Sequence, residues 1–220
     1  MSLKIYGVLR SRATRNVWLA SELGISHEIV PTIQANRLAD PAAPDAPLNT
    51  ASPAFRAINP NGLIPCIDDD GFVLSESLAI NLYLAKKHGG PLAPASLHED
   101  GLMTMWAIWA VAECEPHTIQ ILLHRASLPA DRREPAQADA AVAALRRPFG
   151  VLEAALRAGG GYAVGGRFTV ADINLAEVLR YAQPAAELFA GFPAVAAWLG
   201  ACQARPAFVE MMAQRDAEAA

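Results

Sequence analysis

The chain has 220 residues, 53% of them hydrophobic and 18% charged, and a formal net charge of −4. A chain with this many apolar residues is not expected to be intrinsically disordered. Its length allows two small domains or one large one. Because Lys and Arg are scattered and the charge balance is acidic, neither nucleic acid nor an anionic membrane is expected as a partner.

The first thirty residues predict a strand, a helix and a second strand. Apolar residues over 3–8 and 27–30 favour the strands, and an apolar-periodic stretch over 17–23 favours the helix. Ser11 and Thr14 precede this helix and are candidate N-caps, because their hydroxyls can accept backbone amide hydrogens. A strand, helix, strand order generates a parallel pair of strands.

Residues 31–60 are rich in Pro, Ala, Asn and Asp, which predicts a loop with room for one short helix over 52–58. Two short apolar runs then flank an acidic turn that ends in Gly71, a pattern typical of an antiparallel hairpin. Ser75 is expected to cap a helix over 76–87. The predicted order to this point is βαβ followed by ββα.

Near residue 90 the strand signals disappear and long helical patterns begin, as expected at a domain boundary. The sequence therefore predicts an α/β domain over 1–88 and an all-helical domain over 95–220. Thr169 and Asp172 form a capping-box pattern at the start of one helix of the second domain. The predicted helices of this domain cover residues 99–127, 136–158, 169–181, 193–204 and 206–217.

The cysteines Cys66, Cys114 and Cys202 are widely spaced and odd in number. No CxxC or Cys/His ligand spacing accompanies them, so neither a disulfide framework nor a metal site is expected. The chain shows no long apolar leader and no run of about 18 apolar residues. These features predict a soluble protein of the reducing cytoplasm.

Four local strings, in order along the chain, carry a family resemblance. Residues 11–24 follow the pattern SRAxRxxWxxxELG, and residues 59–65 are similar to NPxGxVP. Residues 72–80 contain the pattern ESxAI, and residues 168–173 match a helix-capping segment. With these strings the whole chain resembles the cytosolic glutathione transferase superfamily, in its bacterial type with a serine active site. The resemblance implies a thioredoxin-like βαβ-ββα domain followed by a helical-bundle domain.

The resemblance also implies which residues bind glutathione. A cis peptide bond between Ile64 and Pro65 would turn the Ile64 backbone toward the cysteinyl part of glutathione, to pair with it as an added strand would. Ser77 would take the γ-glutamyl carboxylate and Glu76 the α-amino group. The start of a helix suits a carboxylate, because its amides are unpaired and its dipole is positive, although an ordinary N-cap has the same sequence pattern.

For the catalytic position the resemblance implies Ser11, whose hydroxyl would donate a hydrogen bond to the glutathione sulfur and favour the thiolate. Arg12 would add positive charge, and Thr14 is the alternative to Ser11. Tyr6, earlier in the strand, is expected to be structural. No cysteine lies between residues 3 and 17, which argues against the glutaredoxin-like members that form a mixed disulfide.

The electrophile pocket is expected between the turn that carries Leu9 and a helix that carries Trp106, Trp109 and Glu113. The two tryptophans are three residues apart and share a helix face, although such aromatic stripes commonly belong to a core. His117 follows a proline and is expected to be structural. The string from Glu113 to His117 has no assigned role.

The implied reaction is attack of the bound glutathione thiolate on a small apolar electrophile, with glutathione as cosubstrate and no metal. Members of this family usually form two-fold symmetric dimers, so the resemblance implies a homodimer. Two alternatives stay open. One is a glutathione-dependent isomerase of the same superfamily, and the other is a binding or interaction protein with this fold and no turnover.

Overall fold

The computed structural model describes residues 3–218 and separates into two compact units. The first unit combines the described part of residues 1–88 with the segment from residue 206 onward, and the second covers residues 89–205.

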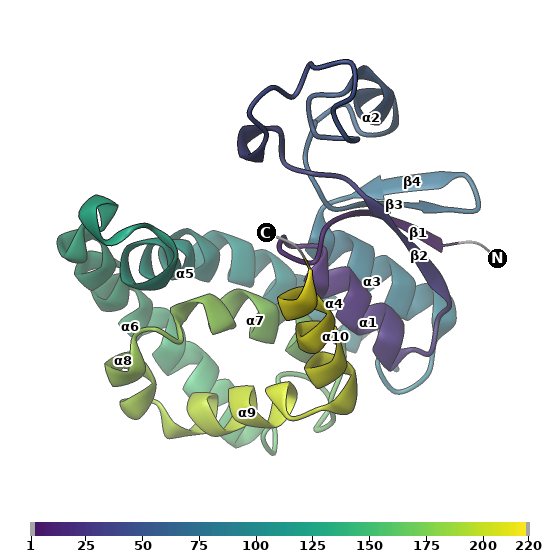
Figure 1. Cartoon of the computed structure of the whole chain (residues 1–220). Helices are drawn as coiled ribbons and strands as arrows, with labels where there is room; N and C mark the ends of the chain where they lie inside the picture. Colours follow the sequence, from purple (N-terminus) through teal and green to yellow (C-terminus); the bar gives the residue numbers. More distant parts are fainter. Residues whose placement is uncertain (1–2, 219–220) are drawn as a thin grey trace. The chain divides into compact units, whose positions relative to one another are not determined.

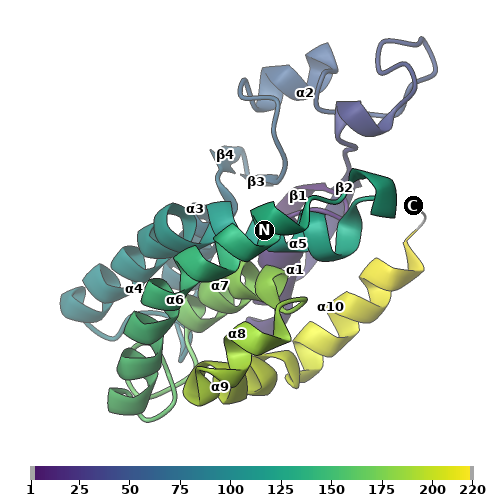
Figure 2. The ribbon, with the colours of Figure 1, turned by 90° about the vertical axis from the view of Figure 1, so that its left-hand side faces the viewer.

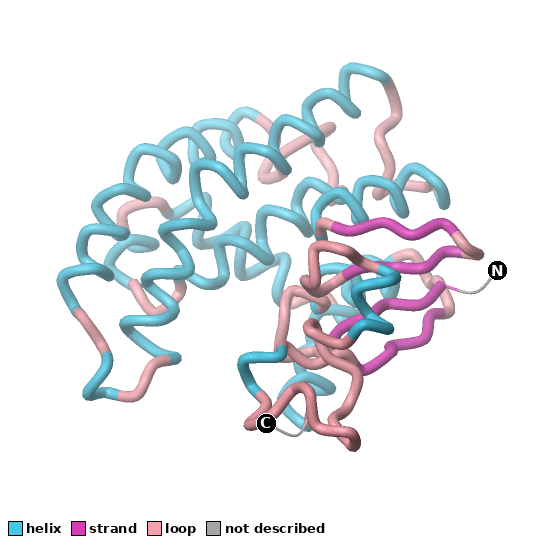
Figure 3. Tube along the Cα trace, turned by 90° about the horizontal axis from the view of Figure 1, so that it is seen from above, coloured by secondary structure: helices cyan, strands magenta, loops and turns pink. Residues whose placement is uncertain are grey.

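The first unit is built on a four-stranded mixed sheet with the order β2-β1-β3-β4. Strand β1 pairs parallel with β2 and antiparallel with β3, and β3 pairs antiparallel with β4. Figure 3 shows the four strands side by side. This arrangement confirms the predicted thioredoxin-like order. The strands are β1 (Leu3–Gly7), β2 (His27–Pro31), β3 (Cys66–Asp69) and β4 (Phe72–Ser75).

Helices cover both faces of this sheet, with α1 and α3 on one face and α2 on the other (Figure 1). Alternation along β1 explains both layers. Tyr6 points to the α2 side, where its ring lies 6.2 Å from that of Phe55, whereas its neighbour Ile5 is buried on the opposite face. The helices of this unit are α1 (Thr14–Glu22), α2 (Pro53–Ile58), α3 (Ser77–His88) and α10 (Pro206–Ala217).

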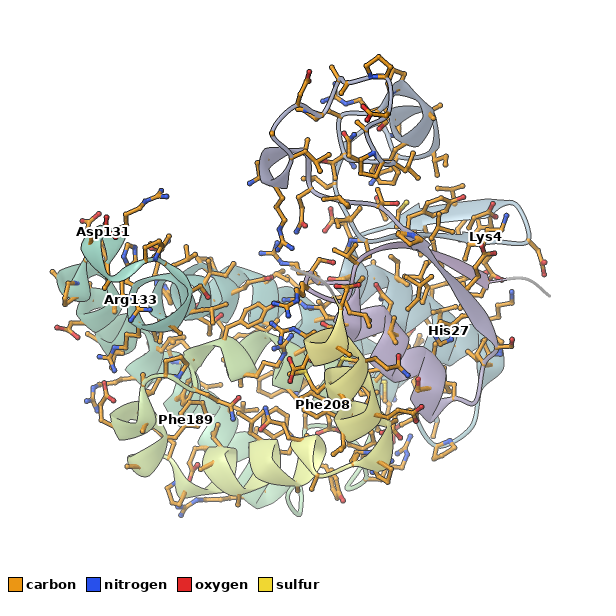
Figure 4. The ribbon with its side chains drawn as sticks, in the orientation of Figure 1. Lys4, His27, Asp131, Arg133, Phe189 and Phe208 are labelled. Carbon is orange, nitrogen blue, oxygen red and sulfur yellow. The ribbon has the colours of Figure 1, made fainter. Side chains whose placement is uncertain are left out.

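Helix α10 belongs to the first unit, although the sequence assigned it to the helical domain. Its buried residues Phe208 and Met211 form one face. The ring of Phe208, labelled in Figure 4, meets Trp18 of α1 edge-on, with centroids 4.9 Å apart. This aromatic contact joins residues far apart in sequence. Helical periodicity therefore predicted the length of α10, but it could not predict that α10 belongs to the first unit.

The second unit is helical, and its central helix is α7, every residue of which is buried. Helices α4 and α9 pack against α7 (Figure 2). At its start Asp172 accepts the N–H of Thr169 at 2.8 Å, which confirms the capping box. The helices of this unit are α4 (Leu97–Trp109), α5 (Glu115–Leu122), α6 (Pro135–Ala158), α7 (Val170–Leu179), α8 (Ala186–Ala190) and α9 (Pro193–Gln203).

The helix predicted over 99–127 is confirmed as one helical run from Leu97 to Ser127, within which the chain widens twice into π-helical turns, at Ala110–Cys114 and Leu123–Ser127. The first turn directly precedes α5, where Pro116 lies in the opening turn. A proline inside a continuous helix removes an amide donor and its ring collides with the preceding turn. The π-helical turn accommodates this collision and accounts for the unassigned Glu113–His117 string. Helix α8 was not predicted, since five residues show too little periodicity.

Candidate functional site

Three segments that the sequence singled out meet at one end of the sheet. Cys66, at the start of β3, pairs with Tyr6 near the end of β1 and with Ser75 at the end of β4. Beyond this row lie the turn that holds Ser11, the peptide bonds that precede Cys66, and the start of α3. Strand pairing therefore gathers residues from three parts of the chain.

Ser11 lies half-buried in the turn between β1 and α1. Its hydroxyl donates to the C=O of Val8 at 2.6 Å, and its Oγ accepts the N–H of Ala13 at 3.1 Å. Thr14 is fully buried, and its hydroxyl donates to the C=O of Ser11 at 3.2 Å. The prediction that Ser11 or Thr14 is the N-cap of α1 is wrong. The turn runs directly into α1, so Ala13 occupies the N-cap position and has no side-chain cap bond.

Gly7 lets Ser11 and Ile64 approach the same point. A Cβ on Gly7 would stand 3.7 Å from the Oγ of Ser11 and 3.9 Å from the Cβ of Ile64. It would also lie 2.8 Å from the Cβ of Ala13, closer than two carbon atoms pack without repulsion. Only glycine therefore allows the strand and the turn to come this close. The peptide bond between Ile64 and Pro65 is cis, as predicted.

The turn before this cis bond is held by Asn59, which is buried. Its Nδ2 donates to the C=O of Leu63 at 2.7 Å, and its Oδ1 accepts the N–H of Asn61 at 3.2 Å. Gly62 has a φ of +60°, and a Cβ there would lie 2.8 Å from the C=O of Thr50. The Asn-Pro-Asn-Gly string is thus explained by the two hydrogen bonds of the Asn59 side-chain amide and by the left-handed backbone conformation of Gly62.

Helix α3 begins at Ser77, one residue later than expected. The C=O of Glu76 accepts the N–H of Ile80 at 2.9 Å, so Glu76 is the residue that starts the helix ladder. Glu76 is exposed and has a φ of 71°, which is uncommon for a residue with a side chain and typical of functional sites. Ser75 is not the cap, because it is still paired with Cys66 in the sheet.

A buried polar network, which sequence reasoning missed, lies behind Ser77. Arg15 is only 1% exposed, and its guanidinium donates to the Oγ of Ser77 at 3.1 Å. Asn16 donates to the C=O of Ser77 at 2.8 Å and to Asn81 at 2.7 Å, and Asn81 donates to the C=O of Arg15 at 3.1 Å. The network joins the starts of α1 and α3. Its only sequence signal was the Arg in the SRAxR string.

The backbone of the turn before Ser11 is also held from two sides. The carboxylate of Glu218 accepts the N–H of Leu9 at 2.9 Å and the N–H of Arg10 at 2.8 Å. Arg37 donates to the C=O of Arg10 at 2.8 Å. Leu9 is buried, whereas Arg12, one residue past Ser11, is exposed. Neither Glu218 nor Arg37 could be found from the sequence, because each contact spans 27 residues or more.

Two groups near this end of the sheet are poor candidates for ionisation. Burial raises the pKa of the Cys66 thiol to about 11, which disfavours the thiolate. Burial also raises the pKa of Tyr6, whose ring packs on Phe55. Both residues belong to the core between the sheet and α2. Cys66 is therefore a small buried side chain of this core.

In the second unit, Trp106 is buried and Trp109 half-buried, and their rings touch edge-on at 5.0 Å between centroids. The predicted shared face is therefore correct. The carboxylate of Glu113 forms an ion pair with Arg147 of α6. That pairing gives Glu113 a structural partner. His117 is half-buried.

Within residues 3–218, no group of three or more His, Cys, Asp or Glu side chains is placed to hold a metal ion. Over the same residues, no helix has the length and apolar character needed to cross a membrane.

Comparison with known proteins agrees with this geometry in both units. Residues 11–87 match the family model described as glutathione S-transferase, N-terminal domain, and residues 114–206 match that of its C-terminal domain. Glutathione S-transferase 3 of Zea mays is 32% identical to this chain, over 96% of this chain and 93% of its own length.

Solved structures give the same result. Glutathione transferase F7 from Populus trichocarpa has a TM-score of 0.81 at 25% identity and covers 97% of this chain and 99% of its own. Glutathione S-transferase-I bound with lactoylglutathione has a TM-score of 0.81 at 26% identity, covering 96% of this chain and 98% of its own. With 32% identity to one relative over nearly the whole of both chains, this protein belongs to the glutathione S-transferase family.

Proposed function

We propose that this protein is a glutathione transferase of the serine type, in which Ser11 activates the glutathione thiol for attack on a small apolar electrophile. The observation that carries the proposal is the approach of the Ser11 hydroxyl and Ile64 to the same point beside Gly7. A peptide paired with the Ile64 backbone would have its cysteinyl sulfur beside that hydroxyl. Named glutathione S-transferases among the relatives support the same activity.

Ser11 is a better candidate than Thr14 for contact with the sulfur. The hydroxyls of both residues donate to a backbone C=O, but Thr14 is fully buried whereas Ser11 is half-buried. In the structure without ligand, the Ser11 proton is directed to the C=O of Val8. On binding, the hydroxyl rotates to the sulfur, a rearrangement common for catalytic hydrogen bonds. The N–H of Ala13 continues to donate to Oγ and polarises the O–H bond.

Two further features favour the thiolate over the thiol. The turn leads into the N-terminus of α1, whose dipole stabilises nearby negative charge. Arg12 is exposed beside Ser11 and carries a permanent positive charge. Together they lower the pKa of a thiol bound at this point, which supplies the nucleophile at neutral pH.

Ser77 and Glu76 form the proposed subsite for the γ-glutamyl group. Because Arg15 donates to the Oγ of Ser77, this oxygen acts as an acceptor toward the protein and keeps its own proton for a ligand carboxylate. The exposed carboxylate of Glu76, held at a left-handed φ, is proposed to pair with the α-amino group.

Leu9, Trp106 and Trp109 are the proposed contacts for the electrophile, with Glu113 a weaker candidate because it pairs with Arg147. A bacterial-type enzyme and a cytoplasmic location are also inferred.

A homodimer is proposed on one structural observation. Helix α4 carries a stripe of exposed apolar side chains, Leu102, Met105 and Ile108, at helical spacing. A second copy of this chain is the partner we propose for it.

The test is calorimetry of glutathione binding, followed by ultraviolet absorbance of the bound thiolate against pH. We expect the wild type to bind glutathione, Ser11→Ala to raise the pKa of the bound thiol by one unit or more, about 1.4 kcal/mol, and Thr14→Val to leave it unchanged. A shift with Thr14→Val alone would transfer the role to Thr14. Absence of glutathione binding would favour the interaction-protein alternative, and turnover without consumption of glutathione would favour the isomerase.

A further inference from the structure

Glu218 contacts the turn before Ser11 through three hydrogen bonds. Its two carboxylate oxygens accept the N–H groups of Leu9 and Arg10, one oxygen for each, at 2.9 and 2.8 Å. Its backbone C=O accepts the Nε of Arg10 at 3.1 Å. Bonds from amides to a carboxylate are stronger than bonds between neutral groups, and a carboxylate suits two adjacent donors because it has no hydrogen of its own.

Glu218 directly follows α10, which is fixed to the helix that the turn enters. Phe208 of α10 packs edge-on against Trp18 of α1, and Met211 is buried on the same face. Helix α10 (yellow in Figure 1), which packs against α1, therefore brings Glu218 to the turn. The turn is continuous with β1 at one end and with α1 at the other, and Glu218 binds its backbone between these two ends.

We propose that Glu218 is a positioning residue of the transferase, which holds the backbone of Leu9 and Arg10 so that the next residue, Ser11, presents its hydroxyl to the glutathione sulfur. This inference rests on the proposed function of Ser11. The Ser11 side chain is itself bonded to the turn, through Val8 and Ala13, so its position follows the path of that backbone. A small displacement of a hydrogen-bond donor costs much of its effect on a developing charge.

The direction in which the pKa of the bound thiol changes distinguishes a positioning role of Glu218 from a purely electrostatic one. Glu218 carries a negative charge close to the turn, and removal of a negative charge by itself lowers the pKa of a nearby thiol. Loss of the Ser11 hydrogen bond has the opposite effect and raises that pKa. In Glu218→Gln an amide NH₂ must face one of the two N–H donors, so one bond is replaced by repulsion while the size is kept.

The experiment measures the pKa of the thiol of saturating glutathione by thiolate absorbance in five proteins: wild type, Glu218→Gln, Ser11→Ala, the double variant and one control. Glu210→Gln is the matched control, since Glu210 lies on α10, is exposed and contacts Gln214. We expect Glu218→Gln to shift the thiol equilibrium about tenfold toward the protonated form, a rise of about one pKa unit. In the double variant the pKa should be equal to or below that of Ser11→Ala, because Glu218→Gln raises the pKa only through Ser11 and the loss of its charge alone lowers it.

A bound-thiol pKa in Glu218→Gln that equals the control or falls below the wild type would overturn the inference, as would equal shifts with and without Ser11. These outcomes leave the proposed function standing if Ser11→Ala alone raises the pKa. If Ser11→Ala does not change the pKa of the bound thiol, the proposed role of Ser11 is refuted by that result alone. Thermal unfolding of each variant checks that the fold is kept, and chlorodinitrobenzene as electrophile gives a parallel value of kcat/KM.

Discussion

Substitution of Gly7 by alanine tests the close approach on which the site depends. The new Cβ would lie 2.8 Å from the Cβ of Ala13, whereas carbon atoms pack at about 3.5–4.0 Å. The end of β1 and the turn must therefore separate by about 1 Å, and overpacking of this kind costs about 1–3 kcal/mol. We expect Gly7→Ala to lower the free energy of unfolding in urea by this amount and to reduce glutathione-dependent turnover as Ser11 moves.

The compensating variant decides whether the contact with Ala13 is the cause. Ala13→Gly alone should cost at most about 0.5–1 kcal/mol of backbone entropy, because Ala13 occupies the N-cap position, where glycine is better tolerated than inside a helix. Combined with Gly7→Ala it removes the collision, so the double variant should be more stable than the two single changes predict when added. Gly200→Ala is the control, because a Cβ there meets nothing within 4 Å. Simple additivity of the two changes, or an undiminished stability of Gly7→Ala, would refute the steric reasoning.

Arg15→Gln should weaken glutathione binding about tenfold and lower the free energy of unfolding by about 1–3 kcal/mol, because the shorter amide cannot reach the buried Oγ of Ser77. Calorimetry and urea unfolding measure the two effects, and intact affinity would remove Arg15 from the γ-glutamyl subsite. Glu99 predicts a pH dependence. Hydrogen bonds from Arg167 lower its pKa to about 2, below that of an unfolded chain. Its contribution to stability is therefore full above about pH 5 and lost toward pH 2, and Glu99→Gln should flatten this acid limb of the unfolding curve. Ile108→Glu should dissociate the proposed dimer, as measured by sedimentation, and an unchanged mass would refute α4 as the interface.

Local chemistry determined much of this protein in advance. The strand order, the hairpin and the capping box follow from alternation, a turn signal and a hydroxyl with a carboxylate three residues on, all of which lie within one short stretch. The cis bond before Pro65 and the Glu76–Ser77 pair came from the family resemblance carried by short strings.

Only the tertiary structure decided how distant segments complete the site. The placement of α10, the bond from Arg15 to Ser77 and the ties from Glu218 to the turn join residues 62 to 209 positions apart. Periodicity reports which face of an element is apolar, and it carries no information on which partner that face meets. A buried charge such as Arg15 has the same sequence signal as an exposed one, so its role became visible only when folding placed it against Ser77.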